Sequence, residues 1–163
     1  MPAARALALL RGVTGVLLIV GAAGRMKFYL VAGILPVPVA TLTWQLELPI
    51  RLSSWLAVHQ SGLLATVVRD LLLPNGALVA GLLVWVEMIT GVLLVLGLRT
   101  RVASVFAGLV SGALVLSAGG AASAGGRSYL LLMVVLLACI VGDAGAIWGM
   151  DGWRRERRRD RNL

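Results

Sequence analysis

The sequence predicts an all-α protein, a bundle of four transmembrane helices with an interfacial helical segment between the first and second. Hydrophobic residues make up 60% of the 163 residues and charged residues only 13%, whereas soluble domains carry about 25% charged residues. The run from Gly76 to Leu98 contains a single charge, Glu87. Its length suits the roughly 30 Å hydrocarbon core of a bilayer. Both observations indicate an integral membrane protein that contacts lipid.

We expect a membrane domain over residues 1–153 whose first span covers about residues 6–35. Arg25 and Lys27 fall in the outer third of that span, where long basic side chains reach toward the interface. Pro36 and Pro38 argue against a further span before Trp44. Residues 36–74 are therefore expected to be extramembrane or interfacial.

The remaining spans are expected at about residues 77–98, 102–118 and 128–148, followed by a basic cytoplasmic tail at 154–163. Placing both termini in the cytoplasm puts ten of the fifteen basic residues inside and five outside. The positive-inside rule favours this orientation. The membrane is expected to be a bacterial or archaeal cytoplasmic membrane. No basic patch is interleaved with aromatic residues, so we do not expect nucleic-acid binding.

An internal repeat links the first two spans. The sequence TGVLL occurs at residues 14–18 and again at 90–94, an offset of 76 that aligns Arg11 with Glu87. Two helices that cross the membrane in opposite directions would form an inverted repeat. The alternative is a coincidence among abundant apolar residues.

Glu87 is the strongest candidate for chemistry, because a carboxyl group at mid-membrane usually has a partner or a function. It is either a proton acceptor or one half of a structural ion pair with Arg25 or Lys27. His59, in the outer segment, is a candidate proton relay or simply a hydrogen-bonded side chain. Asp143 is expected to pair with Arg11, Arg99 or Arg101, and Asp151 to cap or anchor a helix end.

Cofactor chemistry is narrowly limited by composition. With one cysteine, Cys139, and one histidine, the chain holds no CxxC pair and no bis-His haem site. We expect no metal and no cofactor held by side-chain ligands. Electrons for any redox reaction must then come from a partner subunit.

Three stretches resemble the DoxX family of membrane proteins: LRGVTGVLLIVGAAGRMKF at 10–28, LLPNGALVAGLLVWVEMITGVLLVLGLRTRVAS at 72–104 and DAGAIWGMDGW at 143–153. The resemblance implies four membrane helices, with Lys27 or Arg25, Glu87, Arg101 and Asp151 as the polar positions. Relatives include subunits of thiosulfate:quinone oxidoreductase. Two functions therefore stay open. One is a quinone-linked oxidoreductase subunit, with Glu87 and the quinone-binding candidates Arg25, Lys27 and His59. The other is a non-catalytic accessory subunit.

Overall fold

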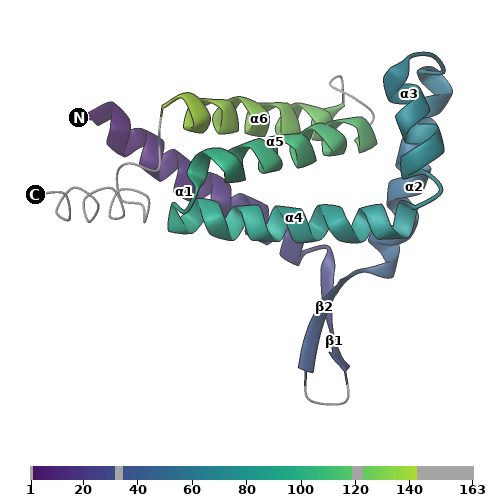
Figure 1. Ribbon diagram of the computed structural model, residues 1–163, viewed down its shortest axis with the longest axis horizontal. Helices are drawn as coiled ribbons and strands as arrows, with labels where there is room; N and C mark the ends of the chain where they lie inside the picture. Colours follow the sequence, from purple (N-terminus) through teal and green to yellow (C-terminus); the bar gives the residue numbers. More distant parts are fainter. Residues whose placement is uncertain (1, 32–34, 119–122, 143–163) are drawn as a thin grey trace, which may run out of the picture.

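The computed structural model describes residues 2–31, 35–118 and 123–142. In chain order they form α1 (Pro2–Ala23), β1 (Met26–Val31), β2 (Leu35–Ala40), α2 (Leu42–Val58), α3 (Leu63–Val67), the π-helical turn η1 (Val68–Leu72), α4 (Gly76–Leu96), α5 (Thr100–Ser117) and α6 (Ala124–Val141). Helices α1, α4, α5 and α6 lie alongside one another, and α2 and α3 cross one end of this bundle (Figure 1).

The first helix is shorter than the sequence predicts. The expected helix through Leu35 is wrong, because α1 ends at Ala23. Gly24 follows it, and two prolines spaced two residues apart, Pro36 and Pro38, disfavour a helix there. The chain instead forms an antiparallel β1–β2 hairpin in which Met26 faces Ala40. This hairpin leaves the bundle sideways (Figure 1).

Helix α2 packs across one end of the bundle. Thr41 caps its first turn by accepting a hydrogen bond from the Trp44 backbone N–H. A Cβ on Gly76 would stand 2.5 Å from Pro49 Cγ, so only glycine lets α4 begin this close to α2. The apolar core at this end runs through α2, α4 and α5 and includes Leu48, Val84 and Leu114.

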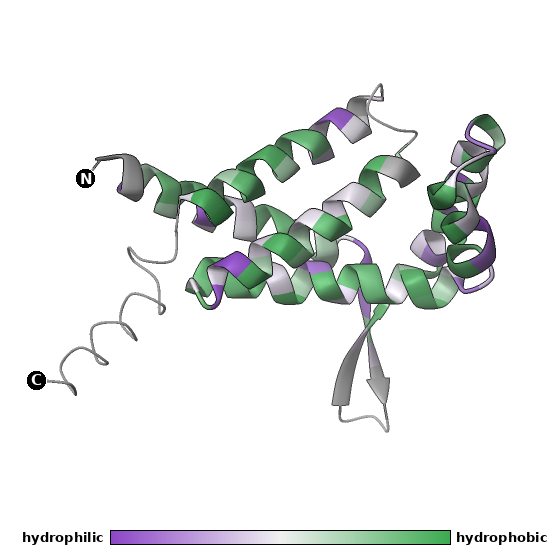
Figure 2. Ribbon diagram, turned by 45° about the horizontal axis from the view of Figure 1, so that its top comes forward, coloured by the Kyte–Doolittle hydropathy of each residue, from purple (hydrophilic) through white to green (hydrophobic). Residues whose placement is uncertain are grey.

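Two helices in the described part of the chain are long and apolar enough to cross a membrane, at Arg5–Ala23 and Gly76–Leu96. The apolar stretches Thr100–Val115 and Gly125–Val141 are shorter. Many large apolar side chains point outward, while Arg11, Thr14, Glu87 and Ser111 are buried. The helices are hydrophobic over most of their length (Figure 2). Apolar exteriors with polar interiors are typical of helices surrounded by lipid.

Candidate functional site

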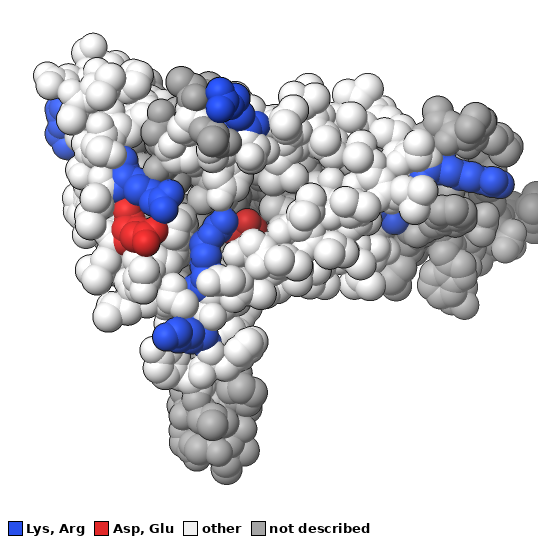
Figure 3. All heavy atoms as spheres, turned by 180° about the vertical axis from the view of Figure 1, so that it is seen from behind, with Lys and Arg blue, Asp and Glu red and all other residues white. Residues whose placement is uncertain are grey.

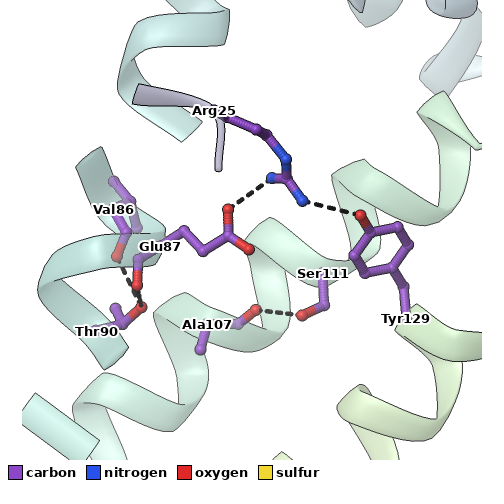
Figure 4. Close-up of polar contacts among 7 residues, drawn as sticks. All are labelled: Arg25, Val86, Glu87, Thr90, Ala107, Ser111 and Tyr129. Carbon is purple, nitrogen blue, oxygen red and sulfur yellow. Dashed lines mark hydrogen bonds and ion pairs between the residues drawn. The ribbon is translucent and has the colours of Figure 1, made fainter. Parts of the chain in front are cut away.

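An enclosed charge cluster forms where α1 ends beside α4. Arg25 Nη1 donates to Glu87 Oε2 at 2.6 Å, and Arg25 Nη2 donates to the Tyr129 hydroxyl at 3.0 Å. The Glu87 side chain is 4% exposed and that of Arg25 is 19% exposed. One guanidinium thus joins the α1–β1 connection, α4 and α6 (Figure 4).

Small and aromatic neighbours shape this cluster. A Cβ on Gly21 would stand 3.1 Å from Glu87 Oε1, so glycine at 21 gives the carboxylate room against α1. The Arg25 guanidinium carbon lies 4.7 Å from the centre of a Trp44 ring, within the range of a cation–π contact. Trp44 is buried, and its Nε1 has no hydrogen-bond partner among the described residues. The guanidinium is therefore held by a carboxylate, a phenol and an indole face.

Hydroxyl groups near the cluster bond to their own helices instead of joining it. Thr90 Oγ1 donates to the carbonyl oxygen of Val86 at 2.7 Å, and Ser111 Oγ donates to that of Ala107 at 2.8 Å. Glu87 consequently depends on Arg25 as its charged partner in the described chain. On the face shown in Figure 3, charged side chains are sparse. Most lie around the base of the hairpin and the nearby end of the bundle, and a further basic group lies at the opposite end.

The repeated sequence lies where α1 crosses α4, and the two helices run in opposite directions (Figure 1). A Cβ on Gly15 would meet Gly91 O at 2.8 Å and Val95 N at 2.9 Å. A Cβ on Gly91 would meet Gly15 O at 2.9 Å and Ile19 N at 3.1 Å. Since Ile19 and Val95 are themselves 76 residues apart, the contacts repeat across a local pseudo-two-fold axis. This is the geometry of an inverted repeat.

The same relation extends to the polar residues of the repeat. Thr14 and Thr90 are each 3% exposed, and each hydroxyl donates to the carbonyl four residues earlier. Arg11 and Glu87 are also each 3% exposed and stand four residues before the glycine of the crossing. Arg11 and Glu87 therefore occupy equivalent buried positions on opposite sides of the crossing, with opposite charge.

The other predicted site residues are not gathered around Glu87. Lys27 is exposed on β1, in register with Val39. His59 ends α2, where its ring stacks on Trp55 with centroids 4.7 Å apart and its Nδ1 lies 3.2 Å from the Trp55 carbonyl oxygen. Arg101 is exposed near the start of α5. Asp143 and Asp151 lie outside the described residues, and so does the tail at 154–163.

Tyr129 and Trp44 were not expected at this site from sequence. No periodic or charge signal singles out Tyr129 in the sequence, and Trp44 resembles an ordinary interface aromatic. Within the described residues no group of three or more His, Cys, Asp or Glu side chains could hold a metal ion. Ionic and hydrogen-bonding chemistry is what the cluster offers: proton exchange at a carboxylate, and donation from a guanidinium and a phenol.

Residues 50–120 match the family model described as DoxX. The match covers less than half of the chain and supports its assignment to the DoxX family. It includes Glu87 and extends from within α2 to the end of α5, whereas Arg25 and Tyr129 lie outside it. No curated protein and no solved structure matches the chain. The apolar helices and the DoxX match together indicate an integral membrane protein, and the ion pair joins a residue of the matched segment to the connection between α1 and β1.

Proposed function

We propose that this DoxX protein is the membrane subunit of a quinone-linked oxidoreductase complex, similar to thiosulfate:quinone oxidoreductase. The observation that carries the proposal is the Arg25 guanidinium, which is shared between Glu87 and Tyr129 within the bundle and is still partly exposed. Such a cluster combines a proton-accepting carboxylate with two hydrogen-bond donors for a carbonyl oxygen. A quinone ring requires these groups, since its two carbonyls take up protons when they are reduced.

The chemistry divides between this chain and a partner. Reduction of one quinone to a quinol takes two electrons and two protons. The partner subunit supplies the electrons, because the described residues offer no ligand set for a metal or haem. Glu87 passes protons to the ring oxygen, while Arg25 and Tyr129 orient that oxygen and stabilise the negative charge that develops on it.

An apolar groove that reaches the residue before Glu87 suits the isoprenoid tail of a quinone. It has a volume of about 390 Å³, lies between η1 and α4 and extends from Leu71 and Asn75 to Val86, the residue before Glu87. Its other lining residues are leucines and valines of the same two elements. An open groove of this kind admits a ligand from the lipid phase without a passage through water.

The proposal includes four spans, α1, α4, α5 and α6, with both termini cytoplasmic. Helices α5 and α6 have 18 residues each, about 27 Å of helix, and they pack along α4. The ten-to-five distribution of basic residues supports the orientation. In this orientation α4 starts at the outer side, and Glu87, the twelfth of its 21 residues, lies at about mid-depth.

The test is quinone reduction by the complex purified from native membranes with a Glu87→Gln substitution. We expect assembly to be retained and quinone-linked turnover to fall by 10²-fold or more, the range for loss of a proton-transfer group. Glu47→Gln is the matched control, because Glu47 is a partly exposed glutamate that pairs with Arg51 of the same helix. Full turnover in Glu87→Gln would refute the catalytic assignment.

A second function is favoured by the shortness of the ion pair itself. At 2.6 Å, with Glu87 almost inaccessible, the pair also fits a purely structural role in an accessory subunit of a larger membrane complex. In that case Glu87→Gln lowers the amount of assembled complex, and each complex that does assemble keeps its turnover. Measuring both quantities separates the two functions.

A further inference from the structure

A groove runs along the outside of the bundle between α5 and α6. It has a volume of about 630 Å³, within the range of small-molecule sites. One wall belongs to α5, from Ser104 to Leu109, and the other to α6, from Leu130 to Ile140. The α6 wall spans about 15 Å of helix, which is half of the hydrocarbon core of a bilayer. The groove is therefore about as long as one leaflet is deep.

The α5 side of the groove is open because glycine stands at position 108. A Cβ on Gly108 would meet nothing within 4 Å, so α6 does not fill the space above it. One turn later, a Cβ on Gly112 would lie 3.9 Å from Met133 Cε. Large apolar side chains beside the gap point outward, with Leu109 66% and Leu137 60% exposed. The groove thus opens toward lipid, and an apolar chain can enter it from the side.

Among the described residues that line the groove, Ser104 alone has a polar side chain. It is fully buried from water, and its Oγ has no hydrogen-bond partner in the described part of the chain. The buried hydroxyls of Thr14, Thr90 and Ser111 differ, because each donates to the carbonyl four residues earlier in its own helix. An unpaired hydroxyl in an apolar setting is costly. Since water does not reach Ser104, a hydrogen-bond acceptor that enters the groove is what can satisfy it.

Basic side chains stand at the end of the groove next to Ser104. Arg101 precedes Ser104 by three residues and Gly108 by seven, so these three positions share one face of α5. Arg99 lies in the connection between α4 and α5, and both arginines are exposed. This end of the bundle is the one opposite α2 and α3 (Figure 1). Positive charge, a hydroxyl and an apolar channel therefore follow one another from the end of the bundle inward.

We propose that this groove binds one acyl chain of an anionic glycerophospholipid from the adjacent leaflet. The order of groups in such a lipid matches the order along α5: the phosphate lies at Arg101, a glycerol ester carbonyl accepts from Ser104 Oγ, and the acyl chain passes Gly108. Arg101 and Ser104 are about 4.5 Å apart along the helix axis, and the long arginine side chain extends further toward the surface. Arg99 adds a second positive charge for the anionic headgroup.

A lipid suits the groove better than a helix of another protein chain. On α5 the groove ends at Leu109, the tenth of the 18 residues of that helix. A membrane-crossing helix would contact α5 over its whole length, whereas an acyl chain reaches only to the middle of the bilayer. The charge also stands at one end of the groove, as it does in a phospholipid.

Native mass spectrometry of the full chain in detergent, titrated with single lipids, tests the site in the wild-type protein. Dioleoyl phosphatidylglycerol supplies the phosphate, the ester carbonyls and the acyl chains, and its dialkyl ether analogue lacks the carbonyls alone. We expect the first ester lipid to bind about fivefold more tightly than the ether lipid, the effect of one hydrogen bond. Ser104→Ala should abolish this difference. Ser111→Ala is the matched control and should keep it, because Ser111 bonds to Ala107 of its own helix.

Two further substitutions test the channel and the charge. Gly108→Leu fills the groove and should weaken lipid binding by roughly tenfold or more, since each buried methylene of the chain stabilises binding. Gly81→Leu is its control, because a Cβ there also meets nothing within 4 Å and the residue lies on α4, away from the groove. Arg101→Gln should reduce the preference for phosphatidylglycerol over phosphatidylcholine about fivefold, the effect of one basic residue at an anionic surface. Arg51→Gln, on α2, should not change it.

Thermal unfolding in detergent verifies that each variant is folded. Equal binding of ester and ether lipids to the wild type, or unchanged binding in Gly108→Leu, would overturn the proposal. Loss of a co-purifying protein subunit in Gly108→Leu, with lipid binding retained, would assign the groove to a partner helix instead.

Discussion

Gly15 and Gly91 are in contact where α1 crosses α4, and each carbonyl oxygen stands where the side chain of the other residue would begin. The separations from a Cβ built on one glycine to the carbonyl oxygen of the other are 2.8 and 2.9 Å. Real Cβ atoms do not approach oxygen so closely, so the crossing requires glycine on both helices. The Arg25–Glu87 pair lies beside this crossing and depends on how closely the two helices approach.

We expect Gly91→Ala and Gly15→Ala each to destabilise the fold by about 1–3 kcal/mol, because the added methyl group pushes the two backbones apart. Gly81→Ala is the matched control on α4, since a Cβ there meets nothing within 4 Å. Alanine at an open helical position is about 1 kcal/mol more favourable than glycine. Thermal unfolding in detergent should therefore lower the midpoint for positions 15 and 91 and leave it equal or higher for position 81.

The Arg25–Glu87 pair gives a second stability test. Glu87→Ala leaves a largely buried guanidinium without its carboxylate, and we expect a loss of about 3 kcal/mol. The double variant Arg25→Met/Glu87→Leu removes both charges and fills similar volume, so it should unfold closer to the wild type. If the double variant is less stable than Glu87→Ala, the pair contributes more by its attraction than it costs by its burial, and our explanation is wrong.

The two tyrosines of the chain form a natural comparison. Tyr129→Phe removes the hydroxyl that accepts from Arg25, and we expect a loss of about 1 kcal/mol while the ion pair persists. Tyr29→Phe is the control, because Tyr29 lies exposed on the hairpin and no hydrogen bond from its hydroxyl is seen. Equal unfolding midpoints for the two variants would show that the Tyr129 hydroxyl contributes nothing to the fold.

The sequence identified Glu87 because a charge in an apolar run is visible without any structure, and its depth pointed to Arg25 or Lys27. It could not choose between those two, since the choice depends on where α1 ends. A continuous helix would have carried both basic residues, but the break after Ala23 leaves Arg25 beside the bundle and takes Lys27 onto the hairpin. The residues that follow Ala23 are apolar enough to resemble a continuing membrane helix. Gly24, Pro36 and Pro38 are the residues in the sequence that indicate the break.

The contacts of Tyr129 and Trp44 with Arg25 could not be predicted from the sequence for a different reason. Their contacts with Arg25 join elements far apart in the chain, and helix packing alone determines them. The repeat shows the opposite case. Its glycines, threonines and oppositely charged Arg11 and Glu87 were visible as a pattern, and coincidence was the alternative. The symmetric contacts of Gly15 and Gly91 give the pattern a physical basis.

The orientation of the chain in the membrane follows from its basic residues and can be measured directly. With ten of fifteen basic residues assigned to the cytoplasmic side, the α2–α3 connection lies outside and the C-terminus inside. A membrane-impermeant maleimide should label Ser61→Cys, an exposed position in that connection, in intact cells. It should label Asn162→Cys only after the membrane is opened. Cys139 is buried and gives little background. Labelling of position 162 but not 61 in intact cells would invert the orientation.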